Sequence, residues 1–139
     1  FTIMREKKMP VLVMFIDLDR LKYINDTFGH EYGDFAIVSI AKAMLKHCDA
    51  DAIAARTGGD EFIVLEGAKD EESGRVLAQK IRTELSKTQR AMQLPFDLGA
   101  SIGAVVAHPG EENVLESYVK RAEMLMYEEK AEKKVSRDS

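Results

Sequence analysis

The chain has 139 residues, 45% hydrophobic and 32% charged, so it is long enough to bury a core and has the composition of an ordinary globular protein. A formal net charge of −4 excludes the strong positive field that attracts proteins to nucleic acid, so no nucleic-acid partner is expected. The single cysteine, Cys48, excludes an internal disulfide and the longest apolar run is too short to span a bilayer, which favours a cytoplasmic location without direct membrane contact from this segment.

The first half of the chain predicts one strand and two helices. The apolar run at 11–17 has no alternation, which is typical of a central strand buried on both faces. The segment 21–28 has room for about two helical turns before Gly29, a residue that suits a helix C-cap. Apolar residues at helical spacing then continue from 35 to 47, with Asp34 as the expected N-cap of a second helix.

The second half predicts a hairpin, two more helices and a further strand. Two short β-rich stretches flank a loop with two glycines, which is the pattern of a β-hairpin. The glycines of the later strand indicate a bulge or the close approach of another backbone. The charged C-terminal tail is expected to fray. The expected segments are strands at 51–56 and 61–66, a helix at 70–90, a strand at 95–107, a turn at 109–113 and a helix from 115 onward.

This order of elements indicates the fold class. Strand, helix, helix, hairpin, helix, strand and helix suit a single sheet with helices packed on it, in one domain that spans 1–139. Periodicity alone leaves two classes open, an α+β and an α/β sandwich.

Four acidic residues stand where strands begin or end. Asp17 and Asp19 close the first predicted strand, and Asp60 and Glu61 begin the second strand of the hairpin. If these strands are neighbours, the carboxylates meet at one end of the sheet, where their mutual repulsion favours a divalent cation. Ligands that are all oxygen atoms point to Mg²⁺ or Mn²⁺ carrying substrate phosphates.

Two glycines come directly before the hairpin acids, in the stretch RTGGDEF at 56–62. Gly58 and Gly59 have no side chain, so a bulky ligand can approach the hairpin backbone and its N–H groups can meet phosphate oxygens. The alternative is an ordinary Gly-Gly turn with surface acids, which explains most isolated GGD sequences. It fits less well here because the acids adjoin strands instead of lying in a solvated run of charges.

RTGGDEF is similar to the signature of the GGDEF family, the diguanylate cyclases, and three further blocks follow the family pattern in order. They are DLDRLKYINDTFGHEYGD at 17–34, ASIGAV at 100–105 and KRAEMLMYEEK at 120–130. The resemblance implies the palm fold of nucleotide polymerases and class III nucleotide cyclases, a ferredoxin-like α+β sheet flanked by helices. It also implies an enzyme that condenses two GTP into cyclic di-GMP and two pyrophosphates, by attack of a 3′-hydroxyl on an α-phosphate across a transient head-to-tail homodimer.

The resemblance assigns catalytic and metal-binding roles to residues around the acids. It implies that Asp17, the Leu18 carbonyl and Asp60 hold Mg²⁺ or Mn²⁺. Glu61 is either a further metal ligand or the base that takes the proton of the hydroxyl. Lys22 adds positive charge beside the phosphates.

The resemblance also assigns a set of GTP-binding residues. Asn25 and Asp34 match the family's guanine readers, and a carboxylate suits guanine because it accepts from N1–H and N2–H₂, whereas adenine has a lone pair at N1. The implied contacts to ribose and phosphates come from the hairpin glycines, the turn after the first strand, the loop before the second helix and the last helix: Gly58, Gly59, Arg20, Leu21, His30, Lys130 and Lys134. For His30 a structural role in its loop is favoured over proton transfer.

Some positions depart from the family pattern. Lys134 stands where the family usually has Arg, which keeps the charge but loses the bidentate geometry, and Lys133 replaces a usual Gly. Asp49 and Ala52 occupy the positions of the family's Arg-x-x-Asp product-inhibition motif. The sequence therefore predicts no product-inhibition site.

Other conspicuous residues are given structural roles. Arg56 is expected to form a salt bridge at the hairpin rather than to contact phosphate. Met124, Met126 and Tyr127 are expected to pack the last helix rather than to touch a ligand. Cys48 has no partner at the spacing of a metal or nucleophile site, and we interpret it as inert.

Two other functions are considered as alternatives to a cyclase that uses GTP. One is a catalytically silent GTP-binding module that regulates an attached domain, and the retained Asp60 and Glu61 count against it. The other is a cyclase that accepts ATP in part, and Asp34 counts against it. Because the chain starts at Phe1 and lacks the family's leading segment, we expect a piece of a longer signalling protein with an attached sensor domain, which another segment could tether to a membrane.

Overall fold

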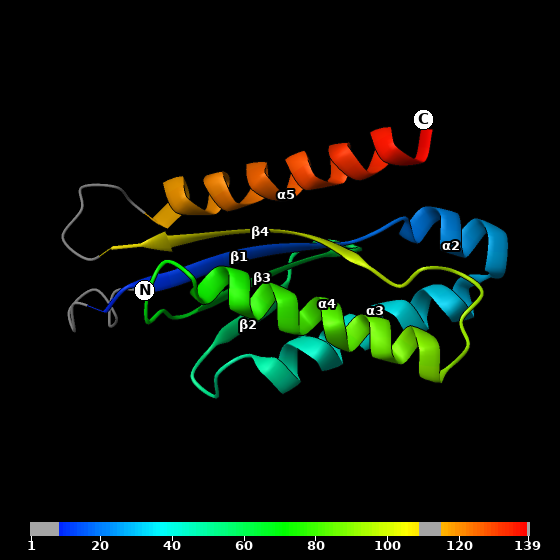
Figure 1. Ribbon diagram of the computed structural model, residues 1–139, viewed down its shortest axis with the longest axis horizontal. Coiled ribbons are helices and arrows are strands. Elements are labelled where there is room, and N and C mark those ends of the chain that lie inside the picture. The colour runs from blue at the N-terminus through cyan, green and yellow to red at the C-terminus, as the bar shows by residue number, and fades with distance from the viewer. Residues whose placement is uncertain (1–8, 109–114, 139) are drawn as a thin grey trace.

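The computed structural model describes residues 9–108 and 115–138, and these residues form eight helices and strands (Figure 1). In chain order the elements are β1 Val11–Leu18, α2 Leu21–Phe28, α3 His30–His47, β2 Ile53–Arg56, β3 Glu61–Gly67, α4 Ser73–Ala91, β4 Ala100–Ala107 and α5 Leu115–Asp138. The predicted order of elements is confirmed, and the turn expected at 109–113 lies outside the described residues.

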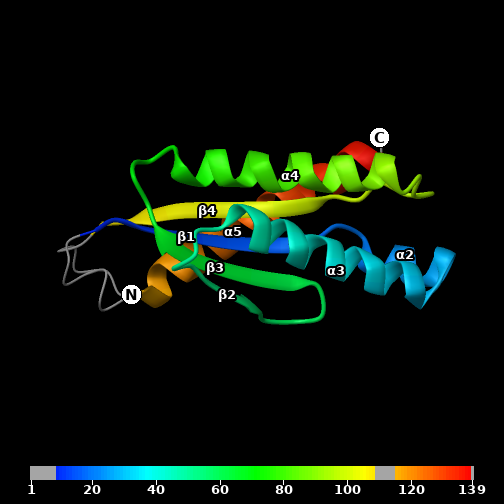
Figure 2. The same cartoon turned by 90° about the horizontal axis from the view of Figure 1, so that it is seen from below.

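The four strands form one sheet in the order β2-β3-β1-β4, and each neighbouring pair is antiparallel. Figures 1 and 2 show α5 on one face of the sheet and α3 and α4 on the other, while α2 extends beyond the end of β1. An antiparallel sheet with helices packed on it is an α+β fold, which decides between the two classes that periodicity left open.

β1 is one of the two inner strands of the sheet, and all eight of its residues are buried. Its even-numbered apolar residues face the core beneath α3 and α4, and its odd-numbered apolar residues face the core beneath α5. Because both faces are covered, the strand needs an apolar run without alternation, as predicted. β3 alternates between buried and half-buried residues, since α5 packs mainly on β4 and β1.

The start of α3 corrects the sequence prediction, because the helix begins at His30 rather than at residue 35. Gly29, with φ of 103°, both ends α2 and starts α3, and its N–H donates to the carbonyl oxygen of Asn25. Glycine reaches such a φ without strain, whereas other residues do not. The predicted C-cap at Gly29 is therefore confirmed. The predicted N-cap at Asp34 is wrong, because Asp34 lies inside the helix with its side chain exposed.

The start of β4 is a second correction, because the strand begins at Ala100 and the segment 95–99 lies outside it. Pro95 has no N–H to give to a ladder. The side chains of Phe96 and Leu98 are buried in the core, and the Leu98 N–H donates to the side chain of Gln89 at 2.8 Å. The segment is apolar because it covers the core, not because it pairs in the sheet.

The backbone of α5 comes very close to β4 at Gly103, which confirms the close approach predicted from the glycines. A Cβ atom at Gly103 would lie 2.0 Å from the carbonyl oxygen of Ala122 and 2.5 Å from the backbone nitrogen of Met126. These distances leave no room for any side chain. Gly103 thus sets how deeply α5 sits on the sheet.

The prediction that the charged C-terminal tail would fray is wrong, because α5 continues to Asp138. Ion pairs to acidic residues at the end of β1 hold it: Lys130 with Asp17 and Lys133 with Asp19. Tertiary contacts therefore override the low apolar content of this segment. Within the described residues no helix is long and apolar enough to cross a membrane.

Candidate functional site

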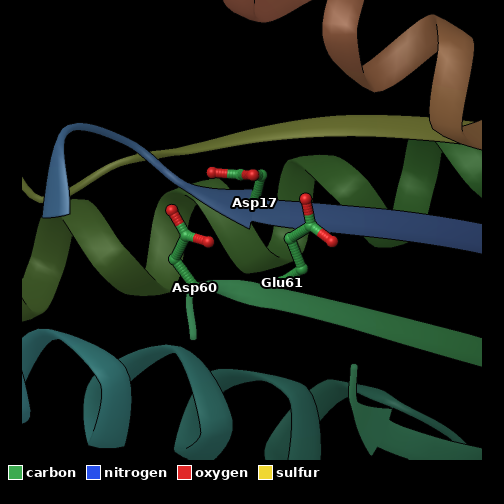
Figure 3. A group of neighbouring side chains, drawn as sticks. All are labelled: Asp17, Asp60 and Glu61. Atoms are coloured by element: carbon green, nitrogen blue, oxygen red, sulfur yellow. The ribbon is translucent and has the colours of Figure 1, made fainter. Parts of the chain in front are cut away.

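Three carboxylates come together at the end of the sheet where β1 stops and β3 starts (Figure 3). Asp17 lies directly opposite Glu61 in the antiparallel register, and Asp60 immediately precedes β3. Carboxylate oxygens of the three residues lie within 4.8 Å of one another. The predicted meeting of acids from the two segments is confirmed for these residues. Asp19 is the exception, because its side chain binds Ser101 and Lys133 instead.

Asp17 is the most deeply buried member of this acidic cluster, with 2% of its surface exposed. The Lys130 ammonium lies 2.7 Å from its Oδ1. The pKa of Asp17 is raised from 3.8 to about 6, mainly because burial penalises the charged form; the hydrogen bond from Lys130 lowers this pKa, and the charges of Asp60 and Glu61 add to the rise. The cluster therefore carries more negative charge than one lysine compensates.

The donor atoms of the cluster fit a hard divalent cation. All three side chains offer oxygen, and the N–H of Leu18 donates to the carbonyl oxygen of Asp60, so the Leu18 backbone faces the same corner. Oxygen donors with one or more carboxylates are what Mg²⁺ and Mn²⁺ select. A cation here would also lower the free energy of holding Asp17 ionised in a buried position.

The raised pKa of Asp17 predicts a pH dependence of stability in the metal-free chain. The folded state holds the Asp17 proton more tightly than the unfolded state, so this contribution is present below pH 3.8 and lost as the pH rises towards 6. We expect the unfolding free energy of Asp17→Asn at pH 7 to be higher than that of the wild type by about 2 to 3 kcal/mol. Near pH 4 the difference should be less than about 0.5 kcal/mol.

Urea unfolding in the presence of a chelator, repeated across this pH range, measures the difference. Added Mg²⁺ is the control, because it should stabilise the wild type more than the variant. A wild type and a variant whose stabilities differ equally at pH 4 and pH 7 would contradict the assignment.

The side chain of Asn25 is oriented by the packing of α2 against α3. Its Oδ1 is buried and finds no hydrogen-bond partner within the described residues. The Oδ1 atom occupies space that a side chain on α3 would fill, because Gly33 lies there and a Cβ would lie 1.7 Å from Asn25 Oδ1. A buried acceptor without a donor is costly unless a ligand supplies one. Asp34 follows Gly33 on α3 and is exposed, and His30 is exposed at the start of that helix.

The N-terminus of α2 has no side-chain capping hydrogen bond from any of the described residues. Its N-cap residue, Arg20, has the left-handed conformation (φ 58°) and makes no capping hydrogen bond, and the first turn contains no acid. Such a helix end favours an anion. Leu21 and Lys22 belong to this first turn, with the Lys22 side chain exposed, and Lys134 is exposed on α5 one turn beyond Lys130.

The hairpin turn between β2 and β3 is held by Arg56. Its guanidinium donates to the carbonyl oxygens of Gly58 and Gly59, so the salt bridge expected from the sequence is replaced by hydrogen bonds within the turn. Neither glycine has a positive φ. A Cβ at Gly59 would meet nothing within 4 Å, and one at Gly58 would make only ordinary contacts with Glu61. The fold itself thus gives no reason for glycine at these positions.

Tyr127 is a site residue that the sequence reasoning missed. Its hydroxyl donates to Glu61 Oε1 at 3.2 Å, and partial burial, together with the Glu61 charge, raises the pKa of the phenol. The predicted packing role holds for Met126, which is fully buried, but not for Tyr127 or Met124, which are 46% and 62% exposed. The available signal was spacing, because Tyr127 precedes Lys130 by three residues and shares its helix face.

Comparison with known proteins agrees with this fold. A family model for the diguanylate cyclase GGDEF domain matches residues 2–136, so the chain belongs to this family, as the resemblance predicted. It is similar to the bifunctional diguanylate cyclase/cyclic di-GMP phosphodiesterase MucR of Pseudomonas aeruginosa (31% identity over 118 residues, 85% of this chain and 17% of that protein). It is also similar to the probable diguanylate cyclase DgcT of Escherichia coli (36% over 127 residues, 89% and 28%).

A similar solved structure is the active GGEEF domain of a diguanylate cyclase from Vibrio cholerae. The identity is 26% and the TM-score 0.78, over 92% of this chain and 81% of that one. The shared fold extends over nearly all of this chain. By contrast, the chain spans less than a third of the length of the two curated relatives.

Proposed function

We propose that this chain is a diguanylate cyclase domain that condenses two GTP into cyclic di-GMP with release of two pyrophosphates. The observation that carries the proposal is the acidic cluster of Asp17, Asp60 and Glu61 at the sheet end from which α2 starts with an uncapped N-terminus. A divalent cation and a triphosphate fit side by side in such an arrangement. The names of the curated relatives support the same activity.

In this proposal Asp17, Asp60 and the Leu18 carbonyl would hold Mg²⁺ or Mn²⁺, and Glu61 serves as the base. The bound cation would neutralise charge on the phosphates. The first-turn amides of α2 bind the terminal phosphates, and Lys22 and Lys134 add positive charge. Lys130 lies 2.7 Å from Asp17 and is within reach of a phosphate beside that carboxylate.

Guanine is bound between α2 and α3. The orphaned Asn25 Oδ1 accepts a hydrogen bond from the base, and the carboxylate of Asp34 accepts from N1–H and N2–H₂. Adenine presents a lone pair at N1, so it would leave Asp34 facing an acceptor. The pocket therefore selects GTP over ATP.

The reaction joins two bound nucleotides. The 3′-hydroxyl oxygen of one GTP attacks the α-phosphorus of the other, the bond to the β-phosphate oxygen breaks, and pyrophosphate leaves with that electron pair. Glu61 takes the hydroxyl proton, and the Tyr127 hydroxyl, which donates to Glu61 Oε1, orients the carboxylate. A second such transfer closes the ring. Each chain supplies one nucleotide site, so two copies must meet head to tail.

A wider context follows from the lengths of the relatives. Because the chain matches a minor part of each curated relative, we propose that it is one domain of a longer signalling protein with a sensor.

His30, at the exposed start of α3, is assigned a structural role at this helix junction beside the base.

Gly59→Ala tests whether the hairpin glycine serves a ligand. We expect the unfolding free energy to stay within about 0.5 kcal/mol of the wild type, because the new Cβ meets no atom within 4 Å. We expect GTP affinity in Mg²⁺ to fall about tenfold, because the methyl group occupies space that the nucleotide needs. Calorimetric titration with a GTP analogue that cannot be cleaved measures the affinity. Unchanged affinity would mean that the glycine is an ordinary turn residue.

Gly33→Ala tests the guanine pocket. Alanine normally stabilises a helix relative to glycine, but here its Cβ would overlap Asn25 Oδ1, so the amide must rotate away. We expect a change in stability below about 1 kcal/mol and a loss of GTP affinity of about tenfold. Asn25→Ala is the matched variant, and combining the two changes should weaken binding no further. Tight GTP binding by Gly33→Ala would remove Asn25 from the pocket.

Incubation of the purified chain with GTP and Mg²⁺, with products separated by mass, tests the proposed function. The product should be cyclic di-GMP, ATP should give no cyclic dinucleotide, and the rate per chain should rise with protein concentration because two copies must meet. Saturable GTP binding without product at high protein concentration would favour the regulatory GTP-binding module instead.

A further inference from the structure

A network of charged side chains fixes the last turns of α5 to the rest of the domain. The Lys133 ammonium donates to Asp19 Oδ2 at 2.7 Å and to the carbonyl oxygen of Ala100 at 2.8 Å. One turn earlier, Glu129 lies 3.3 Å from the Lys133 ammonium and accepts two hydrogen bonds from Arg82 of α4, at 2.8 and 2.7 Å. The network joins α5 to α4, to β4 and to the residue that follows β1.

Asp19 is the point at which this network meets the turn after β1. Both of its carboxylate oxygens are engaged, since Ser101 Oγ donates to Oδ1 at 2.7 Å and Lys133 binds Oδ2. Its backbone N–H donates to the carbonyl oxygen of Gly99 at 2.9 Å. Asp19 is thus held at three points, by Ser101 of β4, by Gly99 just before that strand and by Lys133 of α5.

The residue after Asp19 has an unfavourable backbone conformation. Arg20 has φ 58° and ψ 38°, and for a residue with a side chain this left-handed region costs about 1 to 2 kcal/mol. Such a conformation persists only where its surroundings determine it. Arg20 is also the N-cap of α2, so the conformation of this turn sets the direction of the first-turn amides. Figure 1 shows the C-terminal half of α5 passing above this connection.

We propose that Lys133 is a positioning residue for the triphosphate. By holding Asp19 against β4, it keeps the Arg20 turn and the first amides of α2 in the orientation that receives the terminal phosphates. Lys133 acts through Asp19 and does not itself contact phosphate. This inference rests on the proposed function, because it assumes that the terminal phosphates bind at the α2 N-terminus.

The test compares two ligands that share the base but differ in their phosphates. A GTP analogue that cannot be cleaved, with Mg²⁺, is titrated by calorimetry, and guanosine 5′-monophosphate is titrated by NMR. We expect Lys133→Met and Asp19→Ala each to weaken binding of the GTP analogue about tenfold and to leave the monophosphate unchanged. The double variant should be no weaker than either single variant, because both changes release the same turn. Lys133→Arg should retain most of the affinity.

Lys120→Met is the matched control, because it removes the same charge from the same helix at an exposed pair with Glu116. It should bind both ligands as the wild type does. Tighter binding of the GTP analogue by Asp19→Ala would overturn the proposal, since removal of a negative charge would then outweigh any loss of position. Equal weakening of both ligands by Lys133→Met would also overturn it, because that result reflects a general loss of structure. If the wild type binds neither ligand, the proposed function fails and this inference fails with it.

Discussion

Asp60→Ala is expected to reduce formation of cyclic di-GMP by at least about a thousandfold, since it removes a carboxylate that we propose as a metal ligand where charge develops during phosphoryl transfer. The fold should persist, because the fold uses the backbone of Asp60 rather than its side chain. Its carbonyl oxygen accepts a hydrogen bond from the Leu18 N–H at 2.9 Å, and alanine keeps that bond. Removing one of three neighbouring carboxylates also relieves repulsion on Asp17.

The measurement is the rate of product formation from GTP, with circular dichroism to check the fold. Asp51→Ala is a suitable control, because it removes the same charge from an exposed side chain outside the acidic cluster. We expect the control to keep wild-type activity. An Asp60→Ala protein that is folded and turns over GTP within tenfold of the wild type would exclude Asp60 from the reaction.

Gly103→Ala is expected to destabilise the domain by about 3 kcal/mol or more, enough to leave part of the protein unfolded at ordinary temperatures. The new Cβ would lie 2.0 Å from the Ala122 carbonyl oxygen, and backbone atoms cannot move aside as a flexible side chain can. α5 would have to shift away from β4 as a whole. That shift would open the core formed by Tyr118, Ala122 and Met126 against β1.

Urea unfolding followed by circular dichroism measures the effect. Gly67→Ala in β3 is the matched control, because its Cβ would meet only the mobile end of the Met9 side chain, at 3.4 Å. We expect that control to stay within about 1 kcal/mol of the wild type. Equal stabilities for Gly103→Ala and Gly67→Ala would contradict the close packing of α5 on β4.

The parts of the fold that local patterns determine could be predicted from the sequence. The unalternating run of β1 predicted a strand buried on both faces, and the two glycines between β-rich stretches predicted the hairpin. The sequence predicted that Asp17 would meet Asp60 and Glu61 if the two strands were neighbours, and the register of the sheet meets that condition. The strand and the hairpin needed only the spacing of residues close in the chain.

The parts that depend on distant contacts could not be predicted in the same way. The start of α3 depends on the φ of Gly29, and the continuation of α5 depends on ion pairs with residues more than a hundred positions away. Asp19 was grouped with the other acids because it lies two residues after Asp17. Its side chain binds β4 and α5 instead, and only the register of the sheet reveals this. Tyr127 was assigned to packing because its hydrogen bond joins it to Glu61, a residue distant in the chain.

The central claim is that this chain makes cyclic di-GMP from GTP, and product analysis by mass spectrometry tests it most directly. The chain is incubated with GTP and Mg²⁺ over a range of protein concentrations, and the highest of them is high enough for two copies to associate. We predict cyclic di-GMP and pyrophosphate in a ratio of one to two, with a rate per chain that increases with concentration. Unreacted GTP at every concentration, from a folded protein that binds the nucleotide, would contradict the claim.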